Sequence, residues 1–129
     1  MGNPARLMNE MSAVLIGSRR GHIWHGRLRQ RQTGESASVA FDWAWTLERE
    51  ERRGDVLGFY HTHPDGPTTP SARDVRTMRA WVSCFGKPLL CVIMSGGALS
   101  AYLFQTDEDD GQPLSAVERF PRNVIVAVE

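Results

Sequence analysis

Two histidines one residue apart end a strand-like run in the middle of the chain. They are His61 and His63, and they follow the mostly apolar residues 56–60. Side chains at positions i and i+2 of a strand point to the same face, so the two imidazoles should lie side by side. After a loop rich in proline and glycine, Asp74 is expected in the first turn of a helix, where it can supply an oxygen. Two nitrogens and one carboxylate leave a fourth position open, which is the ligand pattern of a catalytic zinc site.

Each half of this pattern also has a purely structural interpretation. Ser71 and Asp74 have the spacing of a capping box, in which the serine caps a helix and the acidic residue favours the helix dipole. His61 and His63, taken alone, are equally a pair of polar residues at a strand end. Capping and metal binding are compatible, because the helix dipole helps to keep Asp74 ionised. The joint pattern therefore favours a metal site.

A zinc hydrolase also needs a carboxylate that takes a proton from water and passes it to the leaving amine. Glu10 is the favoured candidate, because it immediately precedes the apolar run of residues 11–17, which is expected to be a buried strand. An acidic residue at the mouth of such a strand can meet the end of a neighbouring strand. The alternative is an ordinary exposed carboxylate. The other acidic candidates are Glu35, Asp42, Glu48, Glu50, Glu51, Asp55 and Asp65.

The spacing resembles the signature of the JAMM/MPN+ family of zinc metalloproteases. The resemblance is carried by His61-Thr-His63-Pro, the seven residues 64–70 and Ser71-x-x-Asp74. Upstream, the run from Glu10 to residue 17 is similar to that family's E-x-x-G-L-L-x-G element. The resemblance implies that His61, His63 and Asp74 bind zinc and that Glu10 is the general acid and base. It also implies that Ser71 donates a hydrogen bond to the substrate carbonyl oxygen and stabilises the oxyanion.

The same resemblance implies a substrate class. The family hydrolyses an isopeptide or peptide bond after the C-terminal glycine of a ubiquitin-like protein, either to remove a conjugate or to trim a precursor. A form without Cys/His insertions resembles the prokaryotic branch. That branch implies activating and conjugating enzymes of the same operon as partners, including antiphage operons. Two departures are Ala13 in place of the family's glycine and a first helix that should be truncated or absent, because only residues 3–9 precede Glu10.

Two other functions fit parts of the pattern. One is a catalytically silent MPN scaffold that only binds partners, and such scaffolds generally lack several of the five site residues, all of which are present here. The other is a RadC-like, DNA-repair-associated role, suggested by His63-Pro-Asp-Gly. A formal net charge of zero argues against nucleic-acid binding. A zinc deaminase is excluded because the P-C-x-x-C half of its motif is missing.

Composition is typical of a soluble globular protein. The 129 residues, 41% of them hydrophobic and 23% charged, suit a single domain over residues 1–129. No apolar run reaches the length of a membrane span, and the N-terminus lacks a signal-peptide core. Cys84 and Cys91 are expected to be buried free thiols. Together these features favour a cytoplasmic location with no membrane partner.

The positions of apolar residues, glycines and prolines predict an α/β domain with a mixed sheet of about six or seven strands and about two helices. The resemblance implies a single-layered mixed sheet flanked by helices, the MPN/JAB or cytidine-deaminase-like architecture. The expected strands are residues 11–17, 22–28, 37–42, 56–63, 89–95, 99–105 and 123–128, the expected helices are 43–53 and 71–85, and loops are expected at 30–36, 64–70 and 106–112, with 113–121 ambiguous.

Overall fold

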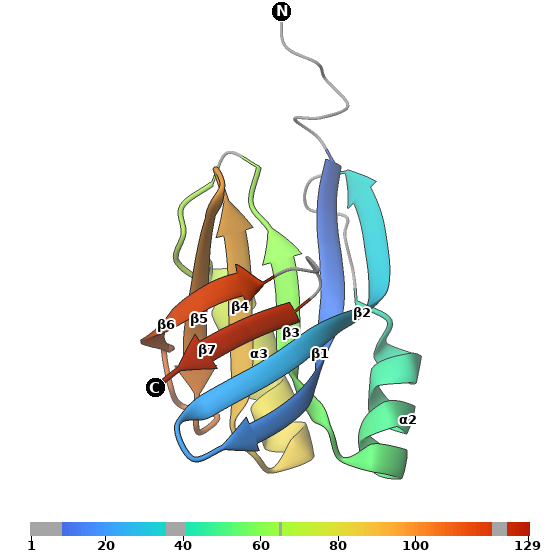
Figure 1. Ribbon diagram of the computed structural model, residues 1–129. Helices are drawn as coiled ribbons and strands as arrows, with labels where there is room; N and C mark the ends of the chain where they lie inside the picture. The colour runs from blue at the N-terminus through green and yellow to red at the C-terminus, as the bar shows by residue number, and fades with distance from the viewer. Residues whose placement is uncertain (1–8, 36–40, 65, 120–123) are drawn as a thin grey trace, which may run out of the picture.

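A computed structural model describes residues 9–35, 41–64, 66–119 and 124–129 of the chain. These residues form seven strands and two helices (Figure 1). In chain order the elements are β1 (Asn9–Arg20), β2 (Ile23–Glu35), α2 (Trp43–Arg53), β3 (Val56–Thr62), α3 (Ala72–Phe85), β4 (Leu89–Ser95), β5 (Ala98–Phe104), β6 (Gln112–Arg119) and β7 (Val124–Val128).

The seven strands close into a barrel in the order β1-β2-β7-β6-β5-β4-β3. All neighbours are antiparallel except β3 and β4, which are parallel and are joined through α3. The expected mixed α/β content is therefore confirmed, but the sheet closes on itself instead of remaining one layer flanked by helices. The long hairpin of β1 and β2 makes closure possible, because β1 pairs with β3 while the start of β2 pairs with β7.

Two apolar cores follow from the alternation of side chains along the strands. One core fills the barrel and includes Leu15, Trp24 and Leu90. The other lies between the outer face of the sheet and the helices, and it includes Phe59 on β3 and Met78 on α3. Because the helices cover only this second face, residues of β1, β3 and β4 that point outward meet α3 rather than solvent.

Several element predictions are confirmed, one is wrong, and one falls largely outside the described residues. The helices at 43–53 and 71–85 form, and left-handed Gly54 and Gly86 end them as expected. The loop predicted at 30–36 is wrong, because residues 30–35 continue β2 beyond a β-bulge at which Gln30 has a φ of 55°. The strand predicted at 37–42 falls largely on residues 36–40, which lie outside the described residues, and Asp42 caps α2 instead. The ambiguous segment 113–121 contributes to β6.

The two cysteines differ in burial. Both are free, and Cys91 is buried as expected, whereas Cys84 is exposed on α3, contrary to the prediction.

The predicted shortening of a first helix concerns residues 3–9, and residues 3–8 lie outside the described part of the chain. Neither described helix is long and apolar enough to cross a membrane.

Candidate metal centre

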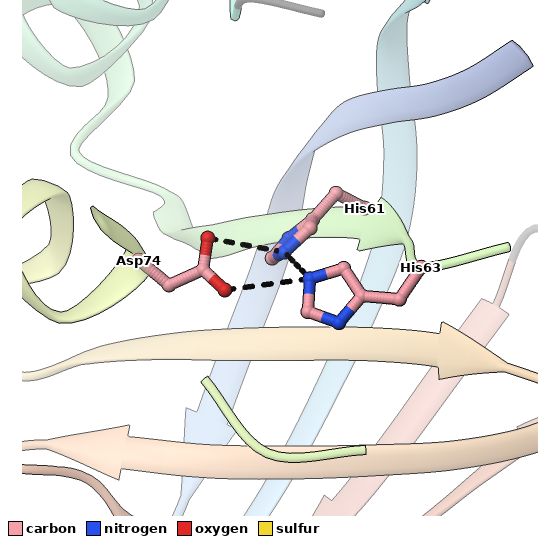
Figure 2. A group of neighbouring side chains, drawn as sticks. All are labelled: His61, His63 and Asp74. Atoms are coloured by element: carbon pink, nitrogen blue, oxygen red, sulfur yellow. Dashed lines mark hydrogen bonds and ion pairs between the residues drawn. The ribbon is translucent and has the colours of Figure 1, made fainter. Parts of the chain in front are cut away.

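Three side chains converge where β3 ends and α3 begins (Figure 2). Nε2 of His61 lies 3.2 Å from Oδ1 of Asp74, and Nε2 of His63 lies 3.4 Å from Oδ2 of the same carboxylate. The two Nε2 atoms are 2.8 Å apart. One ligand atom from each residue can be chosen so that all lie within 4.8 Å of one another. The structure therefore brings together the three residues that the sequence predicted as metal ligands.

Strand register places the histidines on the covered outer face of the sheet. His61 is paired with Ser12 on β1 and with Ile93 on β4. The next residue of the same face is His63, whose backbone N–H donates to the carbonyl oxygen of Met94 at 2.9 Å and so extends the parallel ladder. Backbone pairing on both sides of β3 therefore fixes the two imidazoles toward α3.

Asp74 is held by the start of α3. Its backbone N–H donates to Oγ of Ser71 at 3.0 Å, and its Oδ2 accepts from the backbone N–H of Ser71 at 2.9 Å, so the predicted capping box is formed. Burial would raise the pKa of Asp74, but the hydrogen bond and charge of His61, together with the hydrogen bonds from Ser71, outweigh it and lower the pKa to about 2. The side chain is therefore a carboxylate at neutral pH, which is the form that binds a cation.

His63 is oriented by its other ring nitrogen. Nδ1 lies 2.9 Å from the carbonyl oxygen of Pro67. A carbonyl oxygen can only accept, so Nδ1 carries a proton, and Nε2 is the ring nitrogen that faces His61 and Asp74. A carbonyl that fixes the tautomer in this way is typical of metal-binding histidines.

Side chains of β4 and β5 hold the loop that carries Pro67. Oγ of Ser95 donates to the carbonyl oxygen of Gly66 at 2.7 Å, and the hydroxyl of Tyr102 donates to that of Thr68 at 2.9 Å. These two bonds flank the carbonyl that accepts from His63. Neither side chain could be predicted from the sequence, because no local spacing relates residues 95 and 102 to the loop.

The donor set fits a divalent metal. Two imidazole nitrogens 2.8 Å apart cannot both direct lone pairs at each other without a proton or a cation between them. Nδ1 of His61 is buried and has no hydrogen-bond partner among the described residues, so the ring is oriented through Nε2. Two imidazoles and one carboxylate are ligands that suit zinc and other first-row transition metals.

A cavity of about 360 Å³ lies beside the three ligands, and both predicted catalytic residues line it. Glu10 lies on β1 two residues before Ser12, so it shares the outer face with His61. Ser71 lines the same cavity from the N-cap of α3. The structure thus places Glu10 and Ser71 in one cavity with the ligands, while their catalytic roles stay predictions.

The other acidic candidates have different positions. Three of them serve the structure: Asp42 caps α2, Glu50 pairs with Lys87, and Asp55 pairs with Arg49. Glu48 pairs with Arg52 at the surface. None of the described members of this group lines the cavity. Asp65 and the side chain of Glu35 lie outside the description.

Further residues that the sequence analysis missed line the apolar side of this cavity. Phe41, Trp43 and Phe59 form it together with Met78. A tryptophan that opens an otherwise highly charged helix was a signal that could have drawn attention to Trp43.

Comparison with known protein families gives a match over most of the chain. A family model described as prokaryotic homologs of the JAB domain matches residues 3–108. The matched part contains all the elements from β1 to β5, and it includes His61, His63, Asp74, Glu10 and Ser71. No curated protein matches the chain.

Proposed function

Because this chain belongs to the family of prokaryotic homologs of the JAB domain, we propose that it is a zinc-dependent isopeptidase or peptidase. The observation that carries the proposal is the convergence of His61, His63 and Asp74 in a cavity that Glu10 and Ser71 also line. A silent scaffold has no need for all five residues, so the full set favours an enzyme.

The three converging side chains would hold the metal. Zinc bound there would supply Lewis acidity and would lower the pKa of a water molecule to about 7. The carboxylate of Asp74 and the proton on Nδ1 of His63 are already in the states that such binding requires. A bound metal would take the place of the proton that must otherwise lie between the two Nε2 atoms, so metal binding would release that proton.

Glu10 and Ser71 would do the remaining chemistry. Glu10 takes the proton of the attacking water and delivers it to the leaving amine, a role that needs a carboxylate facing the ligands. The hydroxyl of Ser71 accepts from the backbone of Asp74, and its own proton is donated to the substrate carbonyl as negative charge develops on that oxygen. Both roles agree with the positions of these residues in the cavity wall.

The proposed substrate is the extended C-terminal tail of a ubiquitin-like protein, cleaved after glycine. Residues without side chains let the backbone approach the ligands closely, which supports a glycine at this position. Enzymes that activate and conjugate the same protein, for instance in an antiphage operon, are the proposed partners. The two free cysteines support a reducing compartment, so the proposed location is the cytoplasm.

A panel of fusion proteins tests this function. Candidate ubiquitin-like proteins are joined to a reporter through Gly-Gly, and control fusions carry bulky residues at the same two positions. With zinc supplied, we expect cleavage of the Gly-Gly set and not of the controls. Equal cleavage of both sets, or cleavage of neither, would remove this substrate class.

A further inference from the structure

The cavity beside the candidate metal centre has a polar end and an apolar end. The polar end contains the three ligands, and the apolar end is formed by Phe41, Trp43, Phe59 and Met78. A volume of about 360 Å³ is roughly ten times the share of one water molecule in the liquid. The cavity as a whole is therefore large enough for a side chain in addition to a metal and its water.

Strand geometry relates the two ends. Phe59 precedes His61 by two residues on β3 and points to the same face. Two residues of a strand advance about 7 Å. Consecutive Cα atoms of a substrate are about 3.8 Å apart, and a large side chain adds several ångströms of reach. A residue that flanks a bond held at the ligands can therefore place its side chain at the apolar end.

The aromatic wall is held rigidly. Trp43 stacks on Trp81 of α3, with ring centroids 4.7 Å apart and an angle of 21° between the planes. Phe41 packs against Trp43 and against Phe59, with centroid distances of 5.6 and 4.6 Å. Nevertheless 41% of Trp43 is exposed. A large apolar ring that is both fixed and exposed in a cavity is a binding surface with little ordering cost.

We propose that this aromatic wall is a subsite for a large apolar side chain on the residue that follows the cleaved bond. The inference rests on the proposed function, in which glycine precedes the bond and has no side chain to fill the cavity. The apolar end is then left to the leaving-group side of the substrate. The substrate class becomes a peptide in which glycine is followed by a residue such as Phe or Leu, as in a linear precursor.

Peptide binding tests the subsite. Zinc-loaded Glu10→Gln protein, in which the proposed hydrolysis is blocked, is titrated calorimetrically with Ala-Gly-Gly-X-Ala, where X is Phe, Leu, Ala or Asp. We expect Kd for Phe and Leu to be at least tenfold below that for Ala and Asp, because a large side chain leaves water. Weak binding of every peptide, or equal binding of all of them, would overturn the inference.

Variants of α2 locate the effect. Trp43→Ala, added to the same protein, should abolish the preference for Phe over Ala, whereas Trp43→Phe should keep most of it. Leu47→Ala is the matched control, because Leu47 is 46% exposed on the same helix and is not among the described residues that line the cavity. If Trp43→Ala does not fold, Thr77→Phe provides the second test by filling the cavity from α3. An unchanged preference in the folded variants would contradict the subsite.

Further results distinguish a failure of the subsite from a failure of the proposed hydrolysis. Phe-Gly-Gly-Ala-Ala places the ring before the bond, and binding as tight as that of the Phe peptide above would overturn the assignment to the leaving-group side. If the zinc-loaded parent cleaves Gly-Gly fusions regardless of the next residue, the function holds and the subsite fails. If the preference depends on Trp43 but nothing is cleaved, the subsite holds and the proposed hydrolysis fails.

Discussion

His63 shows how a single residue of this site is determined from several directions. Its backbone N–H is fixed by β4, its Nδ1 by the carbonyl oxygen of Pro67, and its Nε2 faces His61 and Asp74. Three separate segments thus set one imidazole. Because its side chain is already ordered, a ligand held in this way loses little conformational entropy when it binds a metal.

Glu10 is expected to act on protons and not on the metal. Glu10→Gln should keep zinc and the fold, because the ligand set is intact, and should lose turnover about 10²–10⁴-fold. Metal analysis and cleavage of a Gly-Gly fusion measure the two effects. Glu51→Gln, the same change at an exposed position of α2, is the control. Full activity of Glu10→Gln would assign the proton transfer to another group.

Ser71 has a structural role as a helix cap and a proposed chemical role as an oxyanion donor, so Ser71→Ala should lower both stability and turnover. Loss of the cap costs about 1 kcal/mol of unfolding free energy, and loss of an oxyanion donor costs about 10²–10³ in rate. Urea unfolding and turnover separate them. If stability falls while turnover stays the same, Ser71 is a cap only.

The polar residues of the site could be predicted from the sequence, whereas the apolar ones could not. His61, His63, Ser71 and Asp74 lie within one short stretch, so local spacing reveals them. The wall formed by Phe41, Trp43 and Phe59 depends on how α2 packs against β3 and α3, and no local spacing encodes that contact.

At the scale of elements, the loop between β3 and α3 supplies the carbonyl oxygen that keeps a proton on Nδ1 of His63. Ser95 on β4 and Tyr102 on β5 hold its carbonyls, so β4 and β5 act on the site without contributing a ligand. The loop that connects the two histidines to Ser71 and Asp74 is thus anchored by the sheet.

Removal of one anchor should weaken metal binding. Ser95→Ala leaves the carbonyl oxygen of Gly66 without its donor and loosens the neighbouring carbonyl that accepts from His63. Zinc affinity should therefore fall, by no more than the 10–100-fold or so that follows loss of a direct outer partner of a metal-binding histidine. Competition with a chromogenic chelator gives the affinity. Ser115→Ala on exposed β6 is the control. Equal affinities of the two variants would exclude a role for this anchor.

The helices were predictable and the end of β2 was not. Each helix has a side-chain cap, a left-handed glycine and an apolar stripe, which are local signals. Residues 30–35 are polar and lack alternation, and they become a strand because β1 supplies backbone partners. A bulge at Gln30 shifts the register by one residue, and the side chain of Gln30 donates to Asp42 at the start of α2.

At the scale of the whole molecule, the main feature is the closure of the sheet into a barrel. It depends on the pairing of β2 with β7, which joins residues about one hundred positions apart in the chain. Pairing at that separation leaves no trace in hydrophobic periodicity. A mixed sheet could therefore be predicted from the sequence, whereas its closed form could not.

The ion pair of Arg49 and Asp55 joins α2 to the start of β3, and it should make stability depend on pH. The hydrogen bond from Arg49 outweighs burial and lowers the pKa of Asp55. This stabilisation is present above the unfolded pKa of about 3.9 and is lost as pH falls through the lower folded pKa.

Asp55→Asn should therefore cost about 1 kcal/mol of unfolding free energy at pH 7, with a smaller deficit near pH 2. Urea unfolding at several pH values measures it. Glu48→Gln removes the exposed pair with Arg52 and should cost little at any pH. A deficit for Asp55→Asn that does not change with pH would contradict this account.

The central claim is that His61, His63 and Asp74 bind one metal ion, and zinc content after dialysis tests it most directly. We expect one zinc per chain in the parent protein and in His25→Ala, which alters an exposed histidine on β2. His61→Ala and Asp74→Ala should retain little zinc, because each removes a ligand from a site that has three. Full zinc content in both of these variants, with the fold intact, would contradict the assignment.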